Sequence, residues 1–273
     1  MVQFLRKQGC TVRFSSADTR SEVPDNPSLI RASEVIILAV PIAKMEAVLE
    51  ECFPLLDQKV LIEICSVKTF LIRKFEQLQA AYPEVRPHFF SIHPMFSEKL
   101  NDLRGQVVIE THRSATETGT FTAFRQLFEQ HGAFWLSLPY PTHDRIMGVV
   151  QGLNHFNVFV GARTLQRAGF SLPEIQSFAS PTYRIFIVIF TRYVLQNPRL
   201  YAEIQLYNHH VLEILKIFRD ETERLYHLIE QRDEAGFVAY VEAIQPFFAE
   251  NSADTLISDH LIEELGQALS PPE

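Results

Sequence analysis

The chain has 273 residues, of which 47% are hydrophobic and 21% charged, an ordinary balance for a globular protein and too apolar for a disordered one. Its net charge of −8 argues against a nucleic acid or an anionic membrane as partner, because both favour basic surfaces. Three cysteines without metal-ligand spacing favour a reduced, intracellular protein. No apolar run approaches the roughly 18 residues of a membrane span and no signal-peptide core precedes Gly9, so we expect a cytoplasmic protein.

The first half of the chain alternates strand and helix patterns. Strands are predicted at residues 10–14, 34–40, 59–64, 88–92, 106–110 and 133–138, and helices at 1–8, 43–52, 67–81 and 115–130. The run 34–40 is almost continuously apolar, as in a parallel strand that is buried on both faces. This alternation predicts a doubly wound parallel sheet with right-handed crossovers.

The character of the chain changes at residues 139–141, which read Pro-Tyr-Pro. Beyond them we find no convincing strand. Helices are predicted near 142–167, 181–196, 198–232, 234–249 and 253–269. The sequence therefore predicts a Rossmann-like α/β domain over residues 1–138 and an all-helical domain over residues 139–273.

Two turns that follow predicted strands carry the side chains of greatest chemical interest. Ser66 follows the strand at 59–64, and His93 follows the strand at 88–92. If these strands are neighbours, both side chains lie at the carboxyl edge of the sheet, where such sheets bind ligands. A hydroxyl beside an imidazole suits proton transfer near neutral pH. In the alternative interpretation, Ser66 caps the following helix and His93 is a structural histidine in a turn.

The glycine signature of a dinucleotide-binding sheet is not in the sequence. Such a sheet opens with a strand and a G-x-G-x-x-G turn, yet the ten glycines include no G-x-G. Residues 1–14 resemble the helix and second strand that would follow this turn, so we expect the first strand and its loop to be missing. A start codon assigned too far downstream, a fragment and a natural variant each account for that. Ser16 takes the ribose-binding position, where a nearby Arg20 suits NADP and Asp18 suits NAD.

Seven short segments in order along the chain carry a family resemblance. They are VIILAVPI (35–42), SVK (66–68), HPMF (93–96), THD (142–144), GLNHF (152–156), SPTYR (180–184) and LYAEI (200–204). With them the chain resembles prephenate dehydrogenase, and in particular its proteobacterial branch. The resemblance implies a Rossmann-like domain followed by a helical domain that forms a homodimer.

The resemblance also implies a reaction, the oxidative decarboxylation of prephenate to 4-hydroxyphenylpyruvate with hydride transfer to NAD or NADP. His93 matches the catalytic histidine that accepts the proton of the ring hydroxyl. Ser66 matches the serine that bonds this hydroxyl near the nicotinamide, and Val40 and Pro41 match residues that line the cofactor pocket.

In the helical half, Arg184 matches the arginine that holds a substrate carboxylate, for which a guanidinium group is suited. His143 matches a histidine at the edge of the pocket. Inhibition by tyrosine is implied by the resemblance alone. Two alternatives stay open: an arogenate dehydrogenase, and a non-catalytic tyrosine-binding or regulatory relic that has lost the glycine loop.

Overall fold

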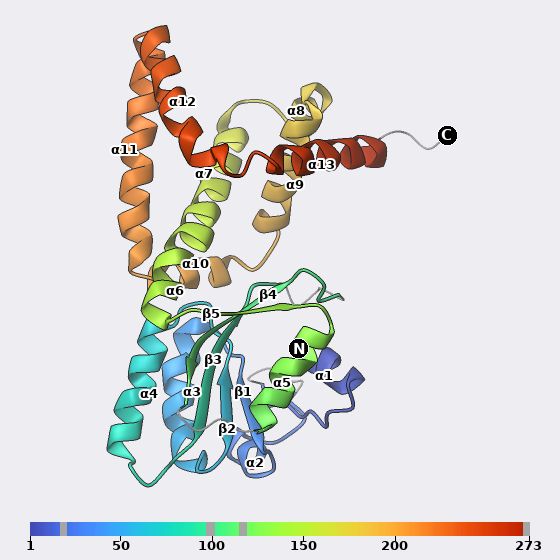
Figure 1. The fold of residues 1–273 in the computed structure, drawn as a ribbon, viewed down its shortest axis with the longest axis vertical. Helices are drawn as coiled ribbons and strands as arrows, with labels where there is room; N and C mark the ends of the chain where they lie inside the picture. The colour runs from blue at the N-terminus through green and yellow to red at the C-terminus, as the bar shows by residue number, and fades with distance from the viewer. Residues whose placement is uncertain (17–20, 97–101, 115–118, 270–273) are drawn as a thin grey trace. The chain divides into compact units, whose positions relative to one another are not determined.

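The computed structural model describes residues 1–16, 21–96, 102–114 and 119–269, and the chain divides into two compact units. The first unit is Met1–Met147 together with Leu206–Asn208 and contains the sheet. The second is Gly148–Gln205 together with His209–Glu273 and is helical throughout its described residues. The predicted fold class, an α/β domain followed by an all-α domain, is confirmed (Figure 1).

The sheet of the first unit has five strands in the order β1-β2-β3-β4-β5. These are β1 (Val35–Leu38), β2 (Val60–Glu63), β3 (His88–Pro94), β4 (Val107–Arg113) and β5 (Phe134–Ser137). Strands β1 and β2, β2 and β3, and β4 and β5 pair in parallel, whereas β3 and β4 pair antiparallel. The described part of the link between β3 and β4 contains no helix, so the chain returns directly along the neighbouring strand. The prediction of a wholly parallel sheet fails at this pairing.

Helices cover both faces of the sheet (Figure 1). The helices of this unit are α1 (Val2–Lys7), α2 (Asn26–Arg31), α3 (Met45–Cys52), α4 (Thr69–Ala81), α5 (Gly119–Gln130) and α6 (Tyr140–Met147). Successive side chains of a strand point to opposite faces. Accordingly, Phe89 of β3 stacks on Phe75 of α4 with ring centroids 4.0 Å apart, and Phe90 stacks on Phe121 of α5 at 3.7 Å. The core therefore lies on both sides of the sheet, as a doubly wound fold requires.

The prediction of a strand at residues 10–14 is wrong. Residues 10–16 lie outside the strands of the structure, and β1 is the edge of the sheet. A strand pattern becomes a strand only when a neighbouring strand accepts its hydrogen bonds, and among the described residues none is present beyond β1. Helix α2 was not predicted because it is short. Its N-cap is Asp25, whose carboxylate accepts from the Ser28 amide at 2.7 Å.

The second unit consists of helices. They are a π-helical segment (Gly148–Leu153), α7 (Asn154–Arg167), α8 (Leu172–Phe178), α9 (Pro181–Val194), α10 (Pro198–Tyr207), α11 (His210–Glu230), α12 (Glu234–Ala249) and α13 (Asp254–Leu269). The π-helical segment interrupts the predicted helix 142–167. A Cβ atom at Gly152 would lie 2.8 Å from Val211, so the glycine allows close packing on α11. Among the described residues, no helix combines the length and apolar character that a membrane crossing requires.

Candidate active site

Residues that the sequence singled out follow three parallel strands of the first unit. Val40 and Pro41 follow β1, Ser66 follows β2, and His93 is the next-to-last residue of β3. Because β1, β2 and β3 are parallel neighbours, their carboxyl ends lie along one edge of the sheet. Ser66 thus lies in the turn after β2, as predicted, whereas the neighbouring strand β3 runs two residues further than predicted and includes His93. Ser66 and Val40 are half-buried and Pro41 is exposed, so this edge is accessible to a ligand.

His93 is the first member of a hydrogen-bonded row of three side chains. His93 Nδ1 lies 2.9 Å from His143 Nε2, and His143 Nδ1 lies 2.9 Å from Asp144 Oδ1. All three side chains are buried, and His143 and Asp144 have no exposed surface. The resemblance implied a pocket-edge position for His143, whereas the structure buries its ring between His93 and Asp144. The arrangement is that of a base with two residues that orient it.

The hydrogen bonds of Asp144 determine where the protons of this row lie. The backbone amides of Lys68 and Thr69 donate to the carboxylate at 3.0 and 2.8 Å, so Asp144 acts as an ionised acceptor. His143 must then donate from Nδ1 and accept at Nε2, and His93 must donate from Nδ1. This assignment leaves the lone pair of neutral His93 on Nε2, the form that a general base requires.

Asp144 also holds the start of helix α4. The N-cap residue of α4 is Lys68, whose own side chain does not cap the helix. The Asp144 carboxylate, contributed by α6, takes that place by accepting hydrogen bonds from the amides of Lys68 and of Thr69, the first residue of α4. A negative charge at a helix N-terminus is stabilised by the helix dipole. The backbone of Asp144 is itself held in place, because Asn208 Nδ2 donates to the Asp144 carbonyl oxygen at 2.8 Å.

Burial, neighbouring charge and hydrogen bonds shift the pKa values of His93 and Asp144, the two ends of the row, in the directions that let His93 accept a proton. Burial holds the pKa of His93 well below its ordinary value, and the ammonium charge of Lys68 lowers that pKa further. Burial alone would raise the pKa of Asp144. The hydrogen bonds from His143, Thr69 and Lys68 outweigh this effect and keep the pKa below its ordinary value. At neutral pH the row therefore holds a neutral His93 and an ionised Asp144.

A buried ion pair that the sequence interpretation missed lies beside His93. Lys68 Nζ donates to Glu63 Oε1 at 2.8 Å and to the carbonyl oxygen of Ile92 at 2.6 Å. Neither side chain of the pair has any exposed surface. The sequence does contain one signal of this ion pair, which is a glutamate, Glu63, in an otherwise apolar strand. A carboxylate in such a strand must find a partner when the strand is buried.

The remaining residues of the predicted cofactor site are only partly described. Ser16 is exposed, and its backbone amide donates to Ser21 Oγ at 3.4 Å. Asp18 and Arg20, which were to decide between NAD and NADP, lie outside the described residues. The assignment of Ser16 to the ribose position therefore stays a prediction.

Arg184 belongs to the second unit, in the first turn of α9. Its side chain is half-buried, and we find no hydrogen bond or ion pair of its guanidinium among the described residues. A half-buried guanidinium without an acidic neighbour suits an anionic ligand. Arg184 and His93 lie in different units, so their joint action on one substrate stays a prediction.

Comparison with known proteins identifies the family. A sequence model described as "Prephenate dehydrogenase, nucleotide-binding domain" matches residues 7–136, and one described as "Prephenate dehydrogenase, dimerization domain" matches residues 140–243. The chain belongs to the prephenate dehydrogenase family. The resemblance that the sequence motifs predicted is confirmed.

Two curated relatives show how much of this family the chain spans. A probable arogenate/prephenate dehydrogenase of Methanocaldococcus jannaschii is 32% identical over 244 residues, which are 87% of this chain and 53% of that protein. A T-protein of Enterobacter agglomerans is 25% identical over 238 residues, which are 87% of this chain and 62% of that protein. The chain thus spans between about half and three-fifths of the length of these two relatives.

Solved structures share the fold. Prephenate dehydrogenase of Aquifex aeolicus, in complex with hydroxyphenyl propionate and NAD+, superposes with a TM-score of 0.64 at 20% identity, covering 84% of this chain and 81% of that one. Arogenate dehydrogenase of Synechocystis gives a TM-score of 0.58 at 21% identity, covering 83% and 82%. At these identities the likeness supports the Rossmann-like fold and the helical unit of the prephenate dehydrogenase family.

The described residues fit one end of a dinucleotide and not the other. Val40, Pro41 and Ser66 follow strands at the edge where α/β sheets bind ligands, and they suit contact with a nicotinamide ring. No pair of glycines in the printed sequence has the G-x-G spacing whose backbone amides approach a pyrophosphate. Among the described residues, those at the strand ends therefore fit the nicotinamide end of a dinucleotide.

Proposed function

We propose that this protein is a cytoplasmic dehydrogenase that oxidises and decarboxylates prephenate to 4-hydroxyphenylpyruvate, with NAD or NADP as hydride acceptor. The observation that carries the proposal is the row His93–His143–Asp144, which directs a neutral imidazole nitrogen at the carboxyl edge of a parallel sheet. The name of one relative, a probable arogenate/prephenate dehydrogenase, supports the same substrate class.

Each residue has a separate task in this proposal. His93 Nε2 accepts the proton of the ring hydroxyl as the carbon that bears it is oxidised, and Ser66 bonds and orients that hydroxyl. Arg184 holds a carboxylate of the substrate. His143 and Asp144 keep His93 in the proton-accepting tautomer, which is a positioning role instead of the substrate contact first expected of His143. Loss of the ring carboxylate as carbon dioxide then makes the ring aromatic.

The test is a titration of the protein with NAD and with NADP, followed by an assay with prephenate. We expect saturable binding of at least one dinucleotide and formation of 4-hydroxyphenylpyruvate. If neither dinucleotide binds at millimolar concentration, the proposal fails for this chain. The same titration decides the preference between NAD and NADP.

Arogenate is the second substrate to assay, because one relative carries both substrates in its name and one related structure is an arogenate dehydrogenase. The two substrates differ at the side chain, where arogenate has an amine and prephenate a keto group. A higher kcat/KM with arogenate would replace prephenate in the proposal and leave the roles of His93 and Ser66 unchanged.

The alternative function that the sequence left open is a non-catalytic homodimer that binds tyrosine. Calorimetric titration with tyrosine distinguishes the two functions. Tyrosine binding in a protein that binds no dinucleotide supports the relic, whereas inhibition of an active enzyme supports a feedback effector.

Replacing Arg184 with glutamine tests the carboxylate contact. We expect the KM for prephenate to rise about 10- to 100-fold, because the substrate loses a charge-assisted hydrogen bond worth about 1.5–3 kcal/mol. The value of kcat should stay within about 3-fold, since this contact forms equally in the ground and transition states. Arg192→Gln, an exposed arginine in the last turn of the same helix, is the control. Equal KM values for the two variants would remove Arg184 from the site.

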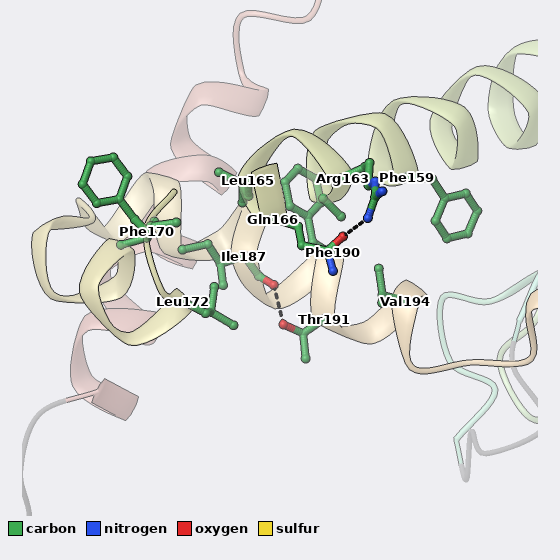
Figure 2. Close-up of a pocket in the computed structure, with 12 residues that line it drawn as sticks. Phe159, Arg163, Leu165, Gln166, Phe170, Leu172, Ile187, Phe190, Thr191 and Val194 are labelled. Atoms are coloured by element: carbon green, nitrogen blue, oxygen red, sulfur yellow. Dashed lines mark hydrogen bonds between the residues drawn. The ribbon is translucent and has the colours of Figure 1, made fainter. Parts of the chain in front are cut away.

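The second unit has unpartnered apolar surface that supports a homodimer. Helix α12 exposes Phe247 and Phe248, at 80% and 60% of their surface, together with Val238, Val241 and Ile244. A groove of about 500 Å³ lies between α7, α8 and α9 and is lined mainly by apolar side chains (Figure 2). Exposed large apolar side chains and an apolar groove are typical of a protein interface.

We expect the protein to elute as a dimer in size-exclusion chromatography with light scattering, and Phe248→Asp to convert it to a monomer at micromolar concentration. The charge would be desolvated in the interface without a partner. Leu136→Asp, which changes an apolar side chain of β5 that is 52% exposed, serves as control and should stay dimeric. A dimeric Phe248→Asp variant would contradict the assignment of α12 to the interface.

A further inference from the structure

The last residue of β2, Glu63, is a buried carboxylate in an apolar strand. Its side chain has no exposed surface. Removing an ionised carboxylate from water is costly unless hydrogen bonds and an opposite charge replace the water. The partners that Glu63 has found are therefore informative about what the residue does.

Both carboxylate oxygens of Glu63 are engaged. Oε2 accepts from the backbone amide of Cys65 at 2.7 Å. Oε1 accepts from Lys68 Nζ at 2.8 Å and also from the hydroxyl of Ser91. Lys68 Nζ donates in addition to the carbonyl oxygen of Ile92 at 2.6 Å. The partners come from the turn after β2, from the N-cap residue of α4, and from β3.

These partners flank the two residues at the centre of the proposed reaction. Cys65 immediately precedes Ser66, and Ile92 immediately precedes His93. One carboxylate thus fixes the turn that presents Ser66 and, through the ammonium of Lys68, the backbone that presents His93. We propose that Glu63 is a positioning residue, which sets the place of Ser66 and His93 relative to each other at the ends of β2 and β3.

Stability alone does not explain why a charged pair, Glu63 and Lys68, is buried here. Replacing a buried ion pair with well-packed apolar residues is often neutral or stabilising. A hydrogen-bonded pair, in contrast, holds atoms at fixed distances, and a displacement of about 1 Å in an active site can lower a rate about 100-fold. The arrangement of Glu63 and Lys68 therefore suits the placing of reactive groups. The inference rests on the proposed function for its rate effect, and its geometric part stands without that function.

Several other charged or titratable groups face the surroundings of His93 and must be considered in its titration. They are Lys68 at the start of α4, His143 and Asp144 on α6, and Glu63 on β2. Lys68 is the cation among them that acts on His93 directly.

The test compares three variants: Glu63→Gln, Lys68→Met and the double variant that carries both changes. Glu50→Gln, which breaks the exposed ion pair with Lys74, is the matched control. We expect Glu63→Gln to lower kcat about 10- to 100-fold with the KM for prephenate within about 3-fold. In nitrogen NMR spectra without substrate, the His93 ring signals should move in Glu63→Gln. Their titration midpoint should rise in Lys68→Met, because a nearby cation that disfavours the imidazolium is gone.

If Glu63→Gln does not fold, the double variant is measured in its place, because it leaves no unpaired buried charge. Wild-type kcat and unmoved His93 signals in a folded Glu63→Gln or double variant would overturn the proposal, and a lower melting temperature alone would not rescue it. A wild-type chain without dehydrogenase activity refutes the proposed function and leaves the NMR spectra to decide the positioning role.

Discussion

Replacing His93 with asparagine is expected to lower kcat by about 10²- to 10⁴-fold, the usual contribution of a general base. Asparagine keeps a polar side chain of similar size at the end of β3 but cannot accept a proton at neutral pH. The KM for prephenate should stay within about 3-fold, because the substrate carboxylate is assigned to Arg184. His88→Asn, at the other end of the same strand, is the control for changes in β3. Equal and mild effects of the two substitutions would contradict the role of His93.

The pH dependence of the wild-type enzyme provides a second measurement of the same group. Burial holds the pKa of His93 well below its ordinary value of about 6.5, so the imidazole is neutral across the physiological range. Since the neutral form is active, kcat/KM should rise with pH through the His93 pKa and be level by about pH 6.5. In His93→Asn this acidic limb should disappear from the residual activity. A limb centred above pH 7 would contradict a buried, neutral His93.

The fold could be predicted where local pattern and long-range pairing agree. The apolar runs that form β1, β2 and β3 predict buried strands whichever strands lie beside them. Their alternation with helices identifies the doubly wound class. The direction of β4 could not be predicted, because its residues have the same pattern in a parallel and an antiparallel strand. The strand predicted at residues 10–14 failed for the same reason, since strand formation depends on a neighbour that the local pattern does not reveal.

The candidate site, like the fold, has residues that could be predicted from the sequence and residues that could not. Ser66 and His93 could be predicted because parallel strands bring the residues after them to one edge. The link from His93 to His143 spans 50 residues and depends on how α6 packs on α4, which no local pattern contains. Asp144 was visible only as part of the THD motif, and Glu63 only as a charge in an apolar run. The residues missed, Asp144 and Glu63, are those to which we assign an orienting role and no contact with the substrate.

Asp144→Asn is the sharper test of that orienting role. The backbone amides of Lys68 and Thr69 can only donate, so the single oxygen of the asparagine amide must face them. Its NH₂ group then faces His143 Nδ1, which must become the acceptor. The protons of the row are thereby reversed: His143 donates from Nε2, His93 accepts at Nδ1, and His93 Nε2 carries the hydrogen. The base is still in place, but its reactive nitrogen cannot accept a proton.

We therefore expect Asp144→Asn to lower kcat roughly 10⁴-fold, the loss seen when the aspartate that orients the histidine of a catalytic triad is made an amide. Dinucleotide binding should be unchanged, and the His93 ring signals in nitrogen NMR spectra should show the hydrogen moved from Nδ1 to Nε2. Asn208→Ala is the matched control, because it removes a hydrogen bond to the backbone of Asp144 and leaves the carboxylate in place. If Asp144→Asn keeps the wild-type tautomer and yet loses activity, Asp144 acts only by holding the start of α4. If both tautomer and activity are kept, the row His93–His143–Asp144 does not orient the base, and the task of holding His93 falls to the carbonyl of Ile92 and the Glu63–Lys68 pair.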